Sequence, residues 1–397
     1  MHSDKKWVFC DNYIHRSLIE FGKYSANVRY RISFAVFSKL LFFLTYSFFK
    51  VLYYYFSQFF IIYTGDIKDK KVIFLKSGNG YDYDNLYKAF DHVESEVVCI
   101  NSFTMKSYMS VTRVGFYTLI GTFLHSVITY LSVVREYLPK HVEYLVIVNG
   151  LRNISQYTFL LSFFKTVYSL NNDIHVCSGG AMLASNASIS ARLKTSYLLH
   201  GNIGYKYPIL FPDFYKVYVY SYDEKLYLDN SGISSDVLVY PFENISTHNK
   251  LVIIFMRMDD EKMDFHELRN LVVFFKFNNY LVKFKLHPQY NGENIYDWAN
   301  TLNVEVVNED IGSASSLISS TLPSFVVAWQ STSLCESLNM GVIPISLSKK
   351  SEMLSKSVYP LNKRTLSWYE EKEIINDAVA STAFYNEVVN LLKRRHV

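Results

Sequence analysis

The sequence predicts an α/β protein of two doubly wound, parallel-sheet domains, preceded by an apolar amphipathic helix. Strand-like runs rich in Val, Ile and aromatic residues alternate with helix-like segments from residue 71 to the end of the chain. A short polar stretch, residues 245–250, divides this alternation into two series. At 397 residues the chain is long enough for two domains of ordinary size. We therefore expect an N-terminal segment over residues 1–70, a first Rossmann-like domain over 71–244 and a second over 251–397.

The N-terminal segment contains one long apolar run over residues 34–63. Lys39, Tyr46, Lys50 and Ser57 recur in it at intervals of seven, four and seven, so they share one face of a helix. The lysines interrupt the run, and no uncharged stretch reaches the ~18 residues of a bilayer span. We expect a helix that lies in the membrane interface without crossing it, with the lysines reaching lipid headgroups. A helix buried against the first domain and a true membrane span are the alternatives.

The first α/β series follows from residue 71. Its predicted strands are residues 71–76, 96–101, 143–153, 173–180, 195–199, 216–221 and 237–241, with helices expected at 83–92, from 154 to 165, at 181–192 and up to 230. Val114 to Val134 is apolar for 21 residues, with only His125 ionisable. It is long enough to cross a membrane, but it stands between two strands of one predicted sheet. We therefore expect a buried or membrane-dipping helix there.

The second series begins with a strand at Leu251. A helix is predicted over 265–277, followed by strands at 281–286, 301–308 and 325–329, a helix at 334–339, a strand at 342–346 and a C-terminal helix. Alternation of this kind implies a parallel sheet with helices on both faces and ligands bound at the carboxyl ends of its strands.

Composition excludes several classes of function. The formal net charge of +4 is too small to argue for nucleic acid as a partner, although it suits an anionic membrane surface. Cys10, Cys99, Cys177 and Cys335 lack metal-ligand spacing, and no Asp-X-Asp pair ends a strand, so we expect no metal and no cofactor. The first ten residues lack the apolar core of a signal peptide, which predicts a reducing, cytosolic environment.

A hydroxyl-rich turn is the first candidate for a binding site. Ser331, Thr332 and Ser333 stand between an apolar strand-like run and a short helix-like segment. The unpaired N–H groups and positive dipole end of such a helix, together with the hydroxyls, suit a phosphate. The alternative is a plain helix cap by Ser331 or Ser333, with Glu336 completing a capping box from Ser333.

A histidine at the end of another strand is the second candidate. His287 and Pro288 follow the alternating run LVKFKL, where a strand of an α/β sheet would present its carboxyl end. A strand ending in His-Pro, followed about forty residues later by one ending in Gln-Ser-Thr-Ser, resembles the nucleotide-binding half of bacterial two-domain (GT-B) glycosyltransferases of surface polysaccharide synthesis. Within that group it most resembles the sialyl-, polysialyl- and Kdo-transferases, which use CMP-activated acidic sugars.

The resemblance implies roles for these residues. His287, Ser331, Thr332 and Ser333 would hold the donor phosphate, with Arg257 as an additional cation and Glu336 on a ribose hydroxyl or merely at the helix start. The acceptor would be a surface polysaccharide or a glycolipid, and the protein would lie peripherally on the cytoplasmic face of the bacterial inner membrane.

The catalytic base is expected in the first domain. His200 and Gly201 follow a predicted strand, and many polysaccharide-building enzymes of this superfamily have a strand that ends in His-Gly at this point. A neutral imidazole can take the proton of a sugar hydroxyl. The sialyltransferase-like families use an acidic residue in a triplet that this domain lacks. Asp82 and Asp84, after the turn Gly78-Asn79-Gly80, are therefore alternative bases.

Other activities remain open at this stage. A CDP-polyol phosphotransferase of teichoic-acid type would use the same His-Pro and Ser-Thr elements, and a UDP- or GDP-sugar transferase would use the same fold. A non-catalytic, membrane-associated scaffold with a degenerate version of the fold is the alternative outside enzymes.

Overall fold

The computed structural model describes most of the chain after residue 33. The described ranges are 34–64, 67–76, 81–90, 94–102, 104–137, 144–180, 182–199, 214–230, 233, 235–257, 263–287, 290, 294–307, 313–353 and 359–395. Within these ranges the backbone alone is described for residues 34–40, 81–84, 94, 129–137, 144–153, 182 and 294.

The first sheet has six parallel strands built from short buried runs. Its order is β2-β1-β3-β4-β5-β6, in which the strands are β1 (Val72–Lys76), β2 (Val97–Asn101), β3 (His175–Gly179), β4 (Lys194–Leu198), β5 (Lys216–Val219) and β6 (Asp236–Val239). Val72 to Leu75 are all buried, as expected for a parallel strand covered on both faces. The chain places β2 outside β1 and then crosses back to β3, so the strand order reverses between β1 and β3.

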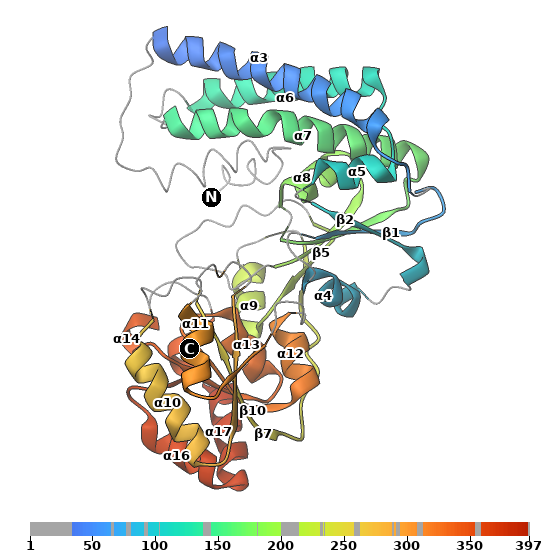
Figure 1. Cartoon of the computed structure of the whole chain (residues 1–397). Coiled ribbons are helices and arrows are strands. Elements are labelled where there is room, and N and C mark those ends of the chain that lie inside the picture. Colours follow the sequence, from blue (N-terminus) through green and yellow to red (C-terminus); the bar gives the residue numbers. More distant parts are fainter. Residues whose placement is uncertain are drawn as a thin grey trace.

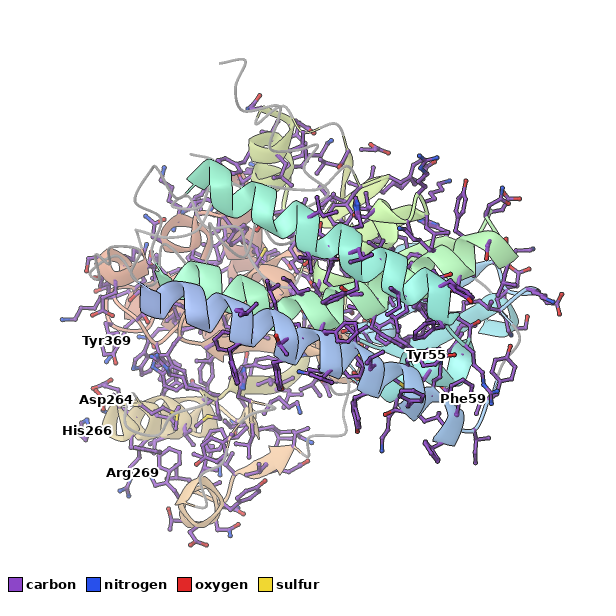
Figure 2. The ribbon with its side chains drawn as sticks, turned by 90° about the horizontal axis from the view of Figure 1, so that it is seen from above. Tyr55, Phe59, Asp264, His266, Arg269 and Tyr369 are labelled. Carbon is purple, nitrogen blue, oxygen red and sulfur yellow. The ribbon has the colours of Figure 1, made fainter. Side chains whose placement is uncertain are left out.

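Shorter helices connect these strands. They are α4 (Tyr81–Phe90) after β1, α5 (Met105–Val111) after β2, α8 (Met182–Ser190) after β3 and α9 (Tyr222–Asn230) after β5, with the 3-10 turns η1 (Gln58–Phe60) and η2 (Glu94–Glu96). Three long helices, α3 (Phe34–Ser57), α6 (Phe116–Tyr137) and α7 (Tyr144–Leu170), pack against one another. They form a layer at the end of the molecule farthest from the second sheet, and the view from above shows them side by side (Figures 1 and 2).

The predicted N-terminal helix is present as α3. Its inner side carries the buried residues Ser47 and Val51, and Gln58 continues this side into η1. The Gln58 amide binds both backbone groups of Val114, with Nε2 donating at 3.0 Å and Oε1 accepting at 2.8 Å. Of the predicted polar stripe, Tyr46 is exposed, Lys50 and Ser57 are half-buried, and the side chain of Lys39 lies outside the described residues.

The strand predicted at residues 143–153 is wrong, because this segment is the first part of helix α7. A short apolar run that contains Val and Ile does not distinguish a buried strand from a buried helix. The tertiary packing decides the outcome here: α7 lies against both α3 and α6, and Phe159, Leu160 and Phe163 on it are fully buried.

The helix predicted at residues 114–134 is present as α6. Leu119 and Phe123 on it are buried, whereas Leu124 and Ile128 are exposed. Phe123 packs against Phe48 of α3, with their ring centroids 5.5 Å apart. Among the helices in the described ranges, none combines the length and the hydropathy that a bilayer crossing requires.

The second sheet also has six parallel strands. Its order is β12-β11-β10-β7-β8-β9, in which the strands are β7 (Asn249–Phe255), β8 (Leu281–Lys285), β9 (Glu305–Val307), β10 (Pro323–Ala328), β11 (Ile343–Ser346) and β12 (Leu366–Ser367). The helices of this half are α10 (Phe265–Phe277), α11 (Asn294–Thr301), α12 (Ala314–Thr321), α13 (Thr332–Asn339), α14 (Lys350–Met353), α15 (Leu361–Arg364), α16 (Lys372–Ala380) and α17 (Thr382–Arg394). Two helix-flanked, parallel sheets confirm the predicted fold class.

The two halves meet through elements at the carboxyl edge of the first sheet. One apolar cluster contains Phe74 and Leu86 of the first half together with Ile318 and Leu334 of the second. Tyr220, directly after β5, accepts a hydrogen bond from the Asn339 side chain of α13 at 2.6 Å. The carboxyl ends of the first sheet therefore face α12 and α13 of the second half.

Candidate functional site

The carboxyl edge of the second sheet brings three candidate positions onto neighbouring strand ends. Arg257 follows β7, Trp329 follows β10 and His287 follows β8, and β7 lies between the other two strands. The strand order reverses between β7 and β10, which is where open α/β sheets bind ligands. Neighbouring strands lie about 4.8 Å apart, so the ends of β8 and β10 are roughly 10 Å apart. That separation suits a ligand with a phosphate and a neighbouring group.

Arg257 lies beside the indole ring of Trp329. Its guanidinium carbon lies 6.0 Å from the centre of the indole ring, and Trp329 is buried. A guanidinium over an indole face is attracted by the ring quadrupole. A guanidinium also carries five N–H donors in a planar fork that matches phosphate oxygens. Arg257 therefore places a positive charge beside a buried indole where the strand order reverses.

The hydroxyl turn is the N-terminus of α13, which starts directly after β10. Ser331 is the N-cap, since its Oγ accepts from the Ser333 backbone N–H at 3.3 Å, and the Ser333 hydroxyl donates to the same oxygen at 2.9 Å. The alternative of a plain cap by Ser331 is confirmed, whereas the capping box from Ser333 to Glu336 is wrong, because the helix begins at Thr332. The N-terminus of α13, with the positive end of its dipole, thus lies at the same edge of the sheet as Arg257.

Glu336 lies one turn into α13, buried against α12. The backbone and the hydroxyl of Ser315 hydrogen-bond its carboxyl group. Burial raises the pKa of Glu336 from 4.5 to about 7, and the two bonds from Ser315 oppose this rise only in part. Its Oε2 atom has no hydrogen-bond partner within the described ranges. A buried carboxyl group with one unsatisfied oxygen is unusual unless it has a role in binding or catalysis.

Glu336 belongs to a buried polar cluster that joins the two halves. Asn85 of α4 accepts hydrogen bonds on Oδ1 from Tyr240 at 3.3 Å and from Ser313 and Ser315, both at 3.2 Å. Ser313 is also the N-cap of α12, accepting from the Ser316 N–H at 3.1 Å. We call Asn85, Tyr240, Ser313, Ser315 and Glu336 the interdomain polar cluster. It links the helix after β1 of the first sheet to the helices that border the phosphate-type site.

The described residues do not place the side chain of any candidate base at this site. His200 lies outside them. The backbones of Asp82 and Asp84 lie in the first turn of α4, and their side chains lie outside the described residues.

Sequence reasoning missed Trp329 and the interdomain polar cluster. Trp329 ends the strand-like run that precedes the hydroxyl turn, so its position beside Arg257 was within reach of the strand pattern. Asn85 and Ser313 are 228 residues apart, and no local pattern connects them.

Comparisons with known proteins give structural similarity only. No protein-family model matches the chain, and no curated protein is similar to it. Among solved structures, Staphylococcus aureus MnaA with UDP has a TM-score of 0.45 and 12% identity, covering 81% of this chain and 91% of that one. Neisseria meningitidis UDP-GlcNAc 2-epimerase bound to UDP-GlcNAc has a TM-score of 0.44 and 13% identity, covering 81% of this chain and 94% of that one. Medicago truncatula UGT71G1 complexed with UDP-glucose has a TM-score of 0.37 and 9% identity, covering 83% of this chain and 92% of that one. At these scores and identities, the similarities assign no activity to this chain.

Proposed function

We propose that the chain is a glycosyltransferase that takes a sugar from a nucleotide-activated donor. The observation that carries this proposal is the collection of Arg257, His287 and the hydroxyl-bearing N-terminus of α13 on adjoining strand ends of one parallel sheet. A fixed cation, an imidazole and a helix N-terminus each favour phosphate oxygens. We call His287, Arg257, Ser331, Thr332 and Ser333 the donor site.

The proposed reaction breaks the bond between the anomeric carbon and the donor phosphate oxygen. An acceptor hydroxyl attacks that carbon, and the nucleotide leaves with the bonding electron pair. Negative charge grows on the departing phosphate, so donors already fixed at the donor site stabilise the transition state more than the ground state. His200 takes the proton of the acceptor hydroxyl, with Asp82 and Asp84 as the alternative bases.

The finer assignment concerns the donor and the acceptor. We propose a CMP-activated acidic sugar, such as sialic acid or Kdo, as the donor, and a cell-surface polysaccharide or lipooligosaccharide as the acceptor. The support is the resemblance of His287-Pro288 and of Ser331 to Ser333 to the corresponding motifs of CMP-sugar transferases.

Glu336 has a separate role in this proposal. Its unsatisfied Oε2 accepts a hydrogen bond from a ribose hydroxyl of the nucleotide. Because this atom is buried, nucleotide binding must separate the residues of the interdomain polar cluster that cover it. An ionised carboxylate accepts a hydroxyl hydrogen bond more strongly than a neutral carboxyl group does. Since the pKa of Glu336 is about 7, nucleotide affinity should rise as the pH increases through neutrality.

A donor panel tests the proposed function. The purified full chain is incubated with CMP, CDP, UDP and GDP, and thermal stabilisation is measured; the corresponding activated sugars and a CDP-polyol are then assayed for turnover. A nucleotide at 100 times its dissociation constant adds about 2.7 kcal/mol of stability. We expect stabilisation by CMP and transfer of an acidic sugar. Polyol-phosphate transfer would replace the proposed reaction, and tight binding without turnover of any donor would indicate a scaffold.

A further inference from the structure

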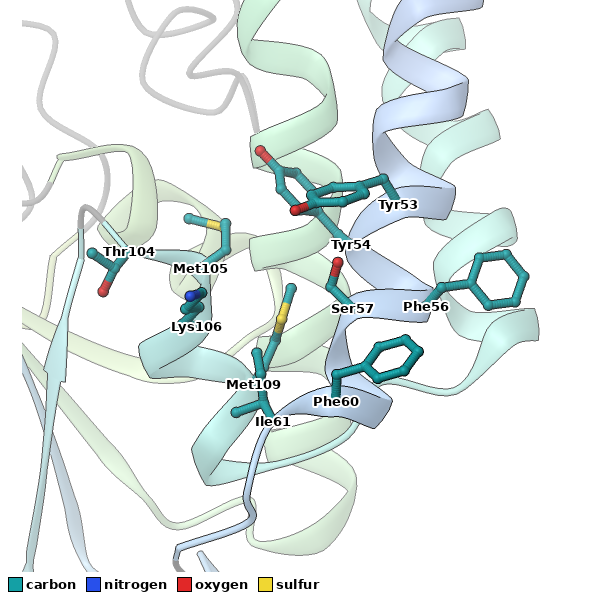
Figure 3. A pocket seen from close by; sticks show the side chains of 10 residues that line it. All are labelled: Tyr53, Tyr54, Phe56, Ser57, Phe60, Ile61, Thr104, Met105, Lys106 and Met109. Carbon is teal, nitrogen blue, oxygen red and sulfur yellow. The ribbon is translucent and has the colours of Figure 1, made fainter.

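A pocket of about 730 Å³ lies between the C-terminal turns of α3, η1 and α5, far from the donor site. Tyr54 and Phe56 of α3 and Phe60 of η1 line one side, and Met105, Lys106 and Met109 of α5 line the other (Figure 3). The volume is within the ~300–1,000 Å³ of typical ligand sites. Aromatic rings and methionine side chains make this wall largely hydrocarbon, so it suits an apolar chain rather than a sugar or a nucleotide.

The mouth of the pocket lies at the end of an exposed aromatic row. Phe42, Tyr46, Phe49, Tyr53 and Phe56 follow one another at steps of four and three residues, so they occupy one face of α3, and all are exposed. Phe60 continues the row and is 89% exposed. Apolar side chains exposed in such a continuous row mark an interaction surface rather than an ordinary protein surface. We call these six residues the aromatic row.

Charge around the aromatic row has one sign. Residues 34–64 and 104–128 contain no Asp or Glu, and their described cations are Lys50, Lys106 and Arg113. The Lys50 ammonium lies 5.7 Å from the centre of the Tyr46 ring, and the Arg113 guanidinium carbon lies 5.7 Å from that of Phe59. Lys106 is exposed and lines the pocket. Aromatic side chains interleaved with cations suit a surface with negative headgroups above hydrocarbon.

We propose that the aromatic row docks on an anionic phospholipid leaflet and that the pocket takes up one hydrocarbon chain of a lipid whose phosphate lies against Lys106. The row lies at the boundary between headgroups and acyl chains. A second copy of the chain fits this surface less well, because a two-fold interface would place the same cations near each other with no acidic residue between them. The lipid site uses no residue of the donor site, so its test is independent of the proposed transfer reaction.

Vesicle binding by the full chain tests the docking surface. We expect binding to vesicles of phosphatidylcholine mixed with phosphatidylglycerol, weak binding to phosphatidylcholine alone, and loss of binding at high salt. Lys106→Gln should lower the partition coefficient about fivefold, the usual effect of removing one cation near an anionic leaflet. Phe60→Ser should lower it as well. Phe277→Ser is the matched control, because Phe277 on α10 is 86% exposed, close to the 89% of Phe60.

A monomeric lipid tests the pocket separately. Dihexanoylphosphatidylglycerol, below the concentration at which it forms micelles, should bind the wild-type chain, whereas glycerol phosphate, which has the headgroup without chains, should not. Ser57→Trp places a bulky ring in the pocket from α3, and Thr104→Trp does so from the opposite wall. The affinity for the short-chain lipid should fall at least tenfold in both variants. Their melting temperatures show whether they are folded.

Three results would overturn the proposal. The first is equal binding of the wild-type chain to neutral and anionic vesicles, together with equal partition coefficients for Phe60→Ser and Phe277→Ser. The second is short-chain lipid binding that neither tryptophan variant weakens. The third is a concentration-dependent dimer that Phe60→Ser dissociates, because it would assign the aromatic row to a second copy of the chain.

Discussion

Replacing Glu336 with Gln should stabilise the protein at mildly alkaline pH and change its stability little near pH 5. Burial raises the pKa of this carboxyl group from 4.5 to about 7, despite the hydrogen bonds from Ser315. Between these two values the folded state binds more protons than the unfolded state. The free energy of unfolding contributed by this group therefore falls as the pH rises through the window.

The size of the effect follows from the shift. A rise of about 2.5 pKa units corresponds to about 3 kcal/mol, and most of it accumulates between pH 5 and pH 8. Gln has the same shape as Glu and stays neutral throughout. The advantage of Glu336→Gln over the wild type should therefore grow by about 2–3 kcal/mol between pH 5 and pH 8.

Urea unfolding at pH 5, 6, 7 and 8 measures this difference. Glu387→Gln is the control, because it makes the same change of side chain at an exposed position on α17, outside the interdomain polar cluster. Other titrating groups are common to all three proteins and cancel in the comparison. A pH-independent difference for Glu336→Gln would show that the carboxyl group titrates normally in the folded protein and would refute its burial in a neutral form.

Three further predictions concern the backbone, the interface and the base. Gly341 has a φ of +89°, and an added Cβ would lie 3.0 Å from the Ile245 carbonyl oxygen, so Gly341→Ala should cost about 1–3 kcal/mol in chemical denaturation; an unchanged midpoint would contradict the strain. Arg364 pairs with Asp223 across the two halves at 2.9 Å, and both side chains are largely buried. Arg364→Ala should cost about 3–5 kcal/mol, with part of the loss recovered when Asp223 is also replaced; the absence of any loss would show that the pair is solvated. His200→Ala should lose turnover while keeping donor affinity, and the acidic limb of its pH–rate profile should disappear. Persistence of that limb in a folded variant would assign the base to a carboxylate.

The fold was largely predictable because both sheets are made of short apolar runs separated by polar turns. Helix α10 begins and ends where its pattern predicts, at Phe265 and Phe277. The failure at residues 143–153 has a physical cause: a buried strand and a buried helix present the same unbroken apolar composition. Only the packing of α7 between α3 and α6 distinguishes them.

The candidate site was predictable in part, for the same local reason. Arg257, His287 and Ser331 each follow a recognisable strand, so their common edge can be inferred from the parallel topology. Glu336 illustrates what local patterns cannot give. Its raised pKa depends on α12 and on burial between the two halves, and these come from residues far away in sequence.

The measurement that tests the donor site most directly is nucleotide affinity after replacement of His287. His287→Ala and the control His125→Ala are titrated with the nucleotide that the donor panel selects, and turnover is measured in parallel; His125 is exposed on α6, in the layer of long helices farthest from the second sheet (Figure 1). We predict that His287→Ala folds normally, binds the nucleotide weakly and loses two to four orders of magnitude in turnover, about 3–5 kcal/mol. His125→Ala should match the wild type. Near-normal affinity and turnover in His287→Ala would contradict the assignment of this strand edge as the phosphate site.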